Sequence, residues 1–207
     1  MRPLALIAAI LVAGLVPAQA FDAQAFDAPV EDVLAGLKRG KVLPIAATAT
    51  LMRASERWCY LEKDGACAWS DIYLEVTDKG ATYEIGNAWN ADYDIVFTDK
   101  GEFRDGRFIC EIDHDWLASV RAFARSDNAP IGGRDLFALK QDIHDMADPV
   151  GHDCFDYQLR GVDRQAGTIE LLQRQYPFGG PDSDPAKDTL VTLHFDPADA
   201  AALTWYW

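Results

Sequence analysis

The sequence lacks the short motifs that mark the common enzyme and nucleotide-binding families. Its 207 residues contain no G-x-S-x-G elbow, no Walker loop, no H-E-x-x-H zinc helix and no EF-hand calcium loop. These absences exclude the catalytic and binding elements that depend on those spacings. They favour a non-enzymatic binding or accessory protein of unspecified ligand.

Long hydrophobic runs are also missing, apart from one near the start. Residues 4–16 are apolar throughout, which is shorter than the ~20 residues that a membrane span needs. Arg2 before this run and Ala-Gln-Ala at 18–20 after it are typical of a cleaved secretory signal peptide. We therefore predict a signal peptide over 1–20, a single globular domain over 21–207, a periplasmic or secreted location, and no integral membrane span after cleavage.

Basic residues are scarce. The chain has 19 Lys and Arg against 33 Asp and Glu, a formal net charge of −14. A surface of this sign repels phosphate backbones, which argues against nucleic acid as a partner. It suits a small cationic ligand or a basic protein. The simpler alternative is that the acidic surface serves solubility alone.

Cysteine is limited to four residues, and none lies in a C-x-x-C redox pair or in the close spacing that opens a zinc site. An even number of cysteines in an exported chain indicates structural disulfides. Four cysteines allow three connectivities. The preferred prediction pairs nearest neighbours, Cys59 with Cys67 and Cys110 with Cys154.

The Asp64-Gly65 dipeptide sets a geometric condition on the first bridge. In a two-residue hairpin turn Glu62 would face Cys67, and Cys59 would lie three residues off register, about 10 Å along the strand. A disulfide tolerates Cα separations only up to ~7 Å. The tight turn and the Cys59–Cys67 bridge are therefore predicted to exclude each other.

Alternating apolar and polar residues predict most of the fold. They indicate an antiparallel meander over 67–112, with Ala68, Ser70, Ile72, Leu74 and Val76 on its core face, and further strands at 154–162, 168–176 and 189–195. Apolar residues at helical spacing predict helices over 29–37, 113–125 and 135–147, whereas 44–56 suits helix or strand. The expected class is α+β and strand-dominated, with antiparallel meander sheets, two to four helices and a single core.

One candidate site lies in the segment EIDHDW, which contains Glu111, Asp113, His114 and Asp115. A histidine flanked by carboxylates can act as a base or face a ligand, and this pattern makes His114 a candidate. Alternatively, Asp113 caps the predicted helix, Asp115 complements the helix dipole and His114 points into water.

The densest ligand-like set lies in DIHDMADPVGHDC, and it contains Asp142, His144, Asp145, His152 and Asp153. Two histidines with a carboxylate suit zinc or iron, and carboxylates alone suit calcium. This set supports the second hypothesis, a metal-dependent hydrolase using residues 142–153. The alternative is a solvated acidic helix end, for which no cofactor is expected.

Two aromatic residues offer a different candidate. Trp69 and Tyr73 alternate with acidic residues on the face of their strand opposite the expected core. Such a face can bind a cation or a basic protein, which makes both residues candidates for facing a ligand. Alternatively, helices cover this face as a second core layer.

Overall fold

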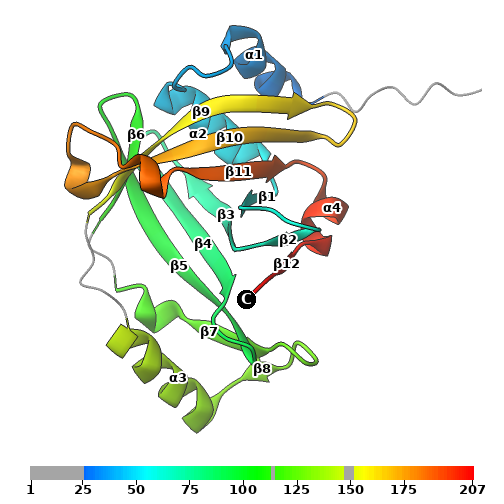
Figure 1. Ribbon diagram of the computed structural model, residues 1–207, viewed down its shortest axis with the longest axis vertical. Coiled ribbons are helices and arrows are strands. Elements are labelled where there is room, and N and C mark those ends of the chain that lie inside the picture. Colours follow the sequence, from blue (N-terminus) through cyan, green and yellow to red (C-terminus); the bar gives the residue numbers. More distant parts are fainter. Residues whose placement is uncertain (1–25, 113–114, 147–151) are drawn as a thin grey trace, which may run out of the picture.

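The strands form a closed antiparallel barrel (Figure 1). The computed structural model describes residues 26–112, 115–146 and 152–207. Eight strands pair in the order β4-β3-β1-β11-β10-β9-β6-β5, and β5 pairs back onto β4. These strands are β1 (Arg57–Tyr60), β3 (Trp69–Val76), β4 (Gly80–Ala88), β5 (Tyr93–Arg104), β6 (Phe108–Glu111), β9 (Cys154–Asp163), β10 (Thr168–Tyr176) and β11 (Thr189–His194).

The strand-dominated α+β class with an antiparallel sheet is confirmed, and the predicted meander is one wall of this barrel. Its strands β3 to β6 pair with their sequence neighbours. Closure depends on β1, which pairs with β3 on one edge and with β11 on the other, so that Tyr60 faces both Trp69 and Val191. Contact between strands this far apart in the chain leaves no local pattern in the sequence.

The described residues contain four α-helices: α1 (Ala28–Gly36), α2 (Ile45–Ala54), α3 (Gly133–Met146) and α4 (Pro197–Ala202). Short 3-10 turns lie at η1 (Leu117–Ser119), η2 (Pro177–Gly179) and η3 (Pro185–Lys187). α1 and α3 match two predicted helices, and the ambiguous segment 44–56 contains α2. Among the described residues, no helix combines the length and apolar character needed to cross a membrane. The predicted signal peptide lies outside the described residues.

The helix predicted over 113–125 is wrong. Residues 113 and 114 are outside the described ranges, and the rest forms η1 and a strand, β7 (Arg121–Ala124). β7 pairs with β5 and with β8 (Pro130–Ile131). The open edge of β5 beyond the barrel accepts this strand, and Val120 and Ala122 are buried with Ile95. Tertiary pairing therefore overrides a helical spacing of apolar residues.

The expected single core is divided into three clusters of buried residues. The largest fills the barrel and extends to α1 and α2, where Val30, Leu51 and Met52 are almost fully buried. A second cluster lies under α3 at the end of β4 and β5 (Figure 1), and includes Ile95 and Ile143. A third surrounds Cys110 and Cys154. The long β4–β5 hairpin separates the second cluster from the barrel interior because it extends beyond the other strands.

Over residues 69–73 the two faces of β3 are reversed relative to the prediction, whereas a register shift after Tyr73 places Val76 against the core, as predicted. Leu74, assigned to the core, is 57 % exposed, whereas Trp69 and Tyr73 pack against the barrel cluster. Asp71, between these two aromatics, is only 6 % exposed. The interior of this barrel holds polar as well as apolar side chains, so polarity alone assigned the faces incorrectly.

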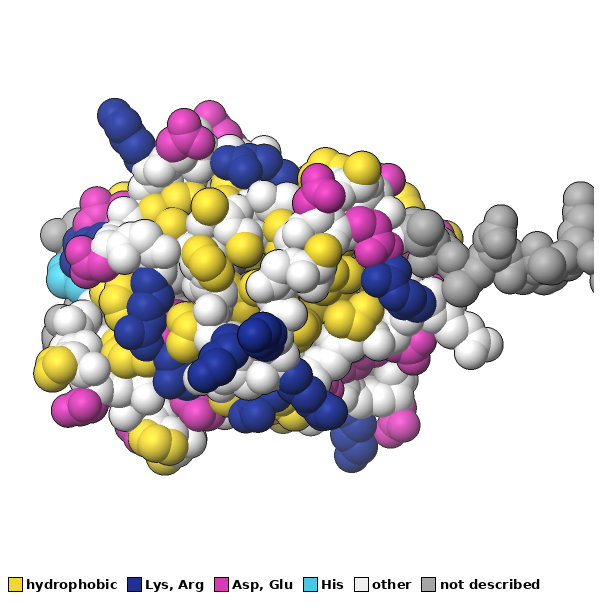
Figure 2. All heavy atoms as spheres, turned by 90° about the horizontal axis from the view of Figure 1, so that it is seen from above, with side chains coloured by type: hydrophobic (Ala, Val, Ile, Leu, Met, Phe, Trp, Pro, Cys, Tyr) yellow, Lys and Arg dark blue, Asp and Glu magenta, His cyan; other side chains and the backbone are white. Residues whose placement is uncertain are grey.

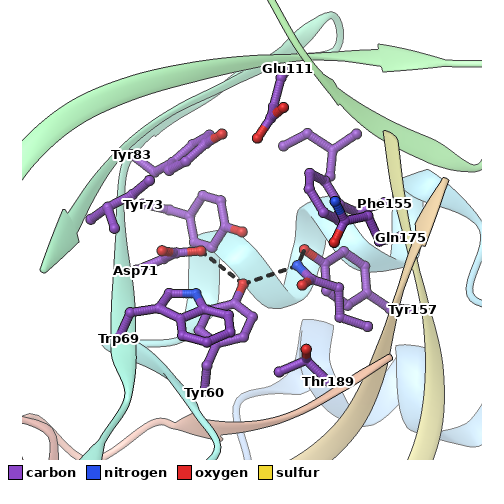
Figure 3. Close-up of a pocket in the computed structure, with 13 residues that line it drawn as sticks. Tyr60, Trp69, Asp71, Tyr73, Tyr83, Glu111, Phe155, Tyr157, Gln175 and Thr189 are labelled. Atoms are coloured by element: carbon purple, nitrogen blue, oxygen red, sulfur yellow. Dashed lines mark hydrogen bonds between the residues drawn. The ribbon is translucent and has the colours of Figure 1, made fainter. Parts of the chain in front are cut away.

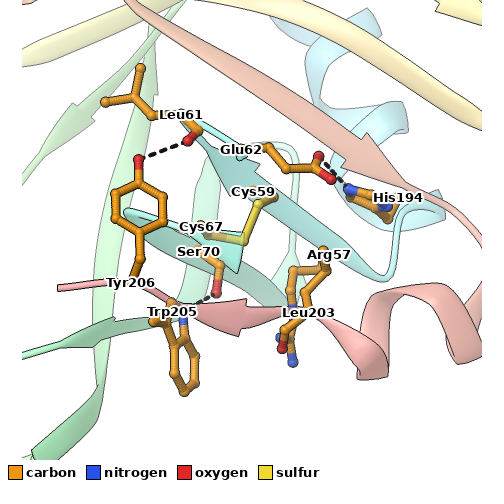
Figure 4. Close-up of a disulfide and its surroundings, with 10 residues drawn as sticks. All are labelled: Arg57, Cys59, Leu61, Glu62, Cys67, Ser70, His194, Leu203, Trp205 and Tyr206. Atoms are coloured by element: carbon orange, nitrogen blue, oxygen red, sulfur yellow. Dashed lines mark hydrogen bonds and ion pairs between the residues drawn. A yellow bond between two sulfur atoms is a disulfide. The ribbon is translucent and has the colours of Figure 1, made fainter. Parts of the chain in front are cut away.

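Both disulfides are present in the nearest-neighbour pairing, Cys59–Cys67 (Figure 4) and Cys110–Cys154. The exclusion between the first bridge and a tight turn is wrong, because the structure has both. Lys63 and Ala66 exchange two backbone hydrogen bonds around Asp64-Gly65, and the Cα atoms of Cys59 and Cys67 are 5.2 Å apart.

Leu61 explains how both features coexist. Its φ of +50° bends the chain between β1 and the tight turn, so the two cysteines do not belong to one straight ladder. Cys59 pairs with Ser70 of β3, while Cys67 belongs to the short strand β2 (Ala66–Cys67). The backbone of Leu61 is held by Leu190 and by the hydroxyl of Tyr206 (Figure 4).

The C-terminal strand β12 (Thr204–Trp205) pairs in parallel with β2. The indole of Trp205 donates a hydrogen bond of 3.0 Å to Ser70 Oγ (Figure 4). Its ring lies directly against Gly86 of β4, where any Cβ would overlap it. Arg125 donates to the Trp205 carbonyl. The end of the chain is thus fastened to the outside of the barrel wall.

Candidate ligand-binding cavity

A cavity of about 280 Å³ lies inside the barrel (Figure 3). Six aromatic side chains line it: Tyr60, Trp69, Tyr73, Tyr83, Phe155 and Tyr157. The polar side chains on its wall are those of Asp71, Glu111, Gln173, Gln175 and Thr189. Of the thirteen described residues that line the cavity, none is a lysine, an arginine or a histidine.

Strand periodicity places these side chains. Successive residues of a strand point to opposite faces, so every second residue enters the barrel. Trp69, Asp71 and Tyr73 therefore enter together from β3, and Phe155 and Tyr157 enter from β9. Behind these residues, α2 crosses the far side of the cavity (Figure 3).

Asp71 is the most deeply buried charged group of the cavity. The hydroxyl of Tyr60 donates a hydrogen bond of 2.8 Å to its Oδ2. Its Oδ1 is buried and has no hydrogen-bond partner among the described residues. Burial raises the pKa of Asp71 to about 7, with a further contribution from the charge of Asp99 and an opposing one from the Tyr60 hydrogen bond.

Glu111 lies on another side of the cavity and also points into it (Figure 3). Burial raises its pKa to about 7, and the charges of Asp153 and Asp99 act in the same direction. The backbone N–H of Asp153 donates to Glu111 Oε2 at 3.1 Å and opposes this rise, as does His152. Two carboxyl groups in one cavity therefore titrate near neutral pH.

The tyrosines of the cavity remain neutral hydrogen-bonding groups. Burial raises the pKa of Tyr60, Tyr73 and Tyr83 well above the ordinary value, and that of Tyr157 to about 12. Gln173 donates a hydrogen bond of 3.1 Å to the Tyr157 hydroxyl. The rings of Tyr60 and Trp69 are stacked, with centroids 4.8 Å apart. The wall is therefore rigid, aromatic and uncharged apart from its carboxylates.

The predicted ligand-facing residues have different outcomes. Trp69 and Tyr73 line the cavity, although their contact with a ligand stays a prediction. This face of β3 is turned into the barrel, where Trp69 and Tyr73 pack in the same buried cluster as Leu51 and Met52 of α2, in line with the alternative of a second core layer. His114 lies outside the described residues, and its neighbour in sequence, Glu111, belongs to the cavity wall.

The predicted metal ligands are not gathered into one group. Asp142, His144 and Asp145 are exposed near the end of α3, where His144 Nδ1 lies 3.3 Å from Asp145 Oδ1. His152 and Asp153 precede β9, and Asp153 contacts Glu111. In the part of the chain that the structure describes, these five residues supply no three ligand atoms within 4.8 Å of one another.

A different trio meets that distance: Cys59, Glu62 and His194. His194 Nε2 lies 2.9 Å from Glu62 Oε2 (Figure 4). Cys59 is bonded to Cys67, and a disulfide sulfur lacks the thiolate that binds metals. In the oxidised protein this trio is therefore a histidine–glutamate contact beside a disulfide, not a metal site.

Sequence reasoning missed most of the cavity. Tyr60, Tyr157 and Gln173 belong to strands with no distinguishing motif. One signal was present at Asp71. It lies between Trp69 and Tyr73, two residues from each, and all three side chains point into the barrel. An acidic residue on the buried face of a strand is rare unless paired or functional.

Comparisons with protein-family models, with curated proteins and with solved structures find no match for this chain.

Proposed function

We propose that this protein is a non-enzymatic binding protein that holds a small organic cation inside its barrel. The observation that carries the proposal is Asp71, a carboxylate 6 % exposed with one oxygen lacking a partner. Tyr60 compensates one oxygen only, and a buried carboxylate oxygen without a partner is unfavourable, since neither water nor a counter-charge replaces its lost hydration. A cationic ligand supplies that counter-charge.

The aromatic walls support the same ligand class. The faces of Tyr and Trp rings carry partial negative charge and attract ammonium groups, most strongly where water is excluded. The stacked pair Tyr60 and Trp69 and the neighbouring Tyr73 surround Asp71 (Figure 3). A cation placed against Asp71 therefore meets a carboxylate and aromatic groups together.

The volume suits a small molecule. An eight-stranded barrel is wide enough to hold one small ligand, and about 280 Å³ is near the lower limit of ordinary ligand pockets. At ~30 Å³ for each water-sized group, this volume corresponds to roughly nine such groups. We infer a ligand with on the order of ten non-hydrogen atoms.

The second partner class, a basic protein, has less support. The face seen in Figure 2 mixes basic, acidic and apolar side chains, with no continuous acidic surface. The two carboxyl groups whose pKa is raised to about 7, Asp71 and Glu111, point into the barrel, out of reach of a protein surface. The metal-dependent hydrolase also lacks support, because its ligands are dispersed over α3 and the start of β9.

The compartment is part of the proposal. We infer that the protein works in the periplasm or outside the cell, because disulfides persist in oxidising compartments and this chain has two. Mass spectrometry of the native protein tests this inference: it should show a mature chain that begins at Phe21 and no thiols that react with iodoacetamide.

The ligand class is tested by calorimetric titration of the mature protein with choline and n-butylamine. The controls are their neutral counterparts, the carbon isostere of choline and n-butanol. We expect binding of the cations but not of the alcohols. Asp71→Asn should weaken binding at least ~10-fold, because a charge-assisted contact is lost.

The matched control is Asp64→Asn. It removes the same charge from an exposed turn residue that does not line the cavity, so cation affinity should be unchanged. Equal binding of alcohols and amines, or no binding of any cation in the panel, would contradict the proposal.

A further inference from the structure

We propose that reduction of the Cys59–Cys67 disulfide creates a zinc site, in which both thiolates bind the ion together with Glu62 and His194. The inference does not rest on the proposed function, because none of these four residues lines the barrel cavity. The disulfide and the zinc ion are alternative links between β1 and β2, one for the oxidised protein and one for the reduced protein.

Strand pairing brings the four side chains together (Figure 4). Cys59 of β1 pairs with the residue two positions before His194 in β11, so the two side chains are on the same face of the barrel wall. Glu62 lies between β1 and the tight turn, and its carboxylate contacts His194. The chain then returns through the turn to Cys67 in β2.

The distances are close to those of a zinc site. Cys59, Glu62 and His194 each offer one ligand atom within 4.8 Å of the other two, and Glu62 Oε2 is 2.9 Å from His194 Nε2. Bonds of ~2.0–2.3 Å in a tetrahedron place zinc ligands ~3.3–3.8 Å apart, so shifts on the order of 1 Å are sufficient. Cys67 supplies the fourth ligand, because its sulfur is bonded to that of Cys59.

The residue types fit the same ion. Thiolate, imidazole and carboxylate are the groups that bind zinc in proteins, and four of them form a closed site. A pocket of about 400 Å³ gives the ion a route, since Glu62 and His194 are on its wall. The two cysteines are fully buried. An ion that enters from the pocket therefore meets the carboxylate and the imidazole first and the sulfurs behind them.

The redox step is thiol–disulfide exchange with a dithiol. The dithiol gives up two electrons and two protons and becomes a disulfide, while the Cys59–Cys67 bond breaks and two thiols form. Zinc then displaces both thiol protons, which pass to water. Access to the buried bridge requires β2 to open, and β2 pairs with β12 over only two residues.

The test compares the oxidised protein with protein reduced by a phosphine and then freed of reductant without air. Iodoacetamide labelling and mass spectrometry count the thiols. One equivalent of cobalt, used as the probe, should give the charge-transfer absorption of thiolate–cobalt bonds in the reduced protein, and zinc should abolish it. Zinc should also raise the melting temperature of the reduced protein, because it binds the folded state. The oxidised protein should show neither effect.

The two cysteine pairs are matched variants for locating the site. Replacing Cys110 and Cys154 by serine removes the other bridge and should leave the cobalt absorption of the reduced protein in place. Replacing Cys59 and Cys67 by serine should abolish it. Circular dichroism shows whether each variant is folded, and the reduced wild type provides the reading if a variant is not.

The other two ligands are tested by His194→Ala and Glu62→Gln. Each should weaken zinc binding to the reduced protein at least ~10-fold, because even residues that only orient a metal ligand contribute that much. The controls are His144→Ala and Glu75→Gln, which change exposed residues outside the pocket and should leave zinc affinity unchanged.

Three outcomes would overturn the zinc site. They are cobalt binding without thiolate absorption, unchanged zinc affinity in His194→Ala and Glu62→Gln, and a reduced protein whose melting temperature does not respond to zinc. None of them affects the organic-cation proposal, which is tested on the oxidised protein.

Discussion

Tyr60 and Asp71 share a buried hydrogen bond of 2.8 Å that fixes one carboxylate oxygen, while the other is buried without a hydrogen-bond partner among the described residues. The bond crosses from β1 to β3, so the pairing that closes the barrel also orients the carboxylate. Closure of the barrel and the orientation of the Asp71 carboxylate thus both depend on the pairing of β1 with β3.

The raised pKa of Asp71 predicts that the ligand-free protein loses stability as the pH rises. Its folded pKa of about 7 exceeds the ordinary value, so the folded state holds the proton longer than the unfolded state. The resulting stabilisation is complete below about pH 4 and is lost as the pH rises toward 7 and above. For this one group, the free energy of unfolding should fall by ~2 kcal/mol between about pH 5 and about pH 8.

Chemical denaturation of wild type and Asp71→Asn at both pH values measures this effect. The titratable groups that face Asp71 are Tyr60, Tyr73, Tyr83, Tyr157, Asp99 and Glu111. Of these, Glu111 titrates in the same range, so the variant should retain part of the pH dependence. A variant with the full wild-type dependence would show that Asp71 is not the responsible group.

Ligand binding should have the opposite pH dependence. A cation requires ionised Asp71 and Glu111, both with a pKa of about 7, so affinity should rise between about pH 5 and about pH 8. Near pH 6 binding should release protons, and the calorimetric enthalpy of n-butylamine binding should then vary with the ionisation enthalpy of the buffer. An enthalpy independent of the buffer would indicate that the carboxyl groups do not change protonation on binding.

The two disulfides should differ in their contribution to stability. The bridge Cys110–Cys154 closes a separation of 44 residues, and Cys59–Cys67 closes one of 8. In the chain-entropy relation, replacing the first pair by serine lowers the free energy of unfolding by ~4 kcal/mol and replacing the second by ~2.5 kcal/mol. Urea denaturation of the two double variants checks the order, and a larger loss for the Cys59–Cys67 pair would contradict it.

Gly86 should be required for docking of the C-terminal strand. A methyl group there overlaps the ring of Trp205, so Gly86→Ala must displace the ring or the strand, at ~1–3 kcal/mol. Gly161→Ala in β9 is the matched control, because a Cβ there meets nothing within 4 Å. Tryptophan fluorescence and denaturation should change for the first variant only. Identical behaviour of the two variants would show that Trp205 does not occupy this position.

Local patterns in the sequence predicted the elements but not their assembly. The apolar spacing after Pro29 and the alternation in β9 and β10 gave a helix and two strands near their observed positions. Pairing of β1 with β11 has no local signature, since it joins residues far apart in the chain. The helix predicted over 113–125 is wrong for a similar reason. Part of this segment forms β7, which pairs with the edge of β5.

The candidate site was predictable only in part, because it too is assembled by pairing between strands far apart in the chain. Trp69 and Tyr73 drew attention through their alternation with acidic residues, but the face was assigned by polarity. Only barrel closure turns this face inward and brings Tyr157 and Gln173 toward Asp71. The Cys59–Cys67 region shows why counting residues along a straight hairpin can fail. One residue with positive φ, Leu61, bends the chain so that the tight turn and the disulfide can both form.

The position of β1 between β3 and β11 has a consequence for how the chain acquires its shape. Residues 189–194 must be in place before the wall can close, so closure waits for a segment that follows β1 by more than a hundred residues. Topologies of this kind fold slowly because distant segments must meet first. Until that encounter, one edge of β1 and one edge of β11 stay unpaired, and an unpaired strand edge can pair with another chain.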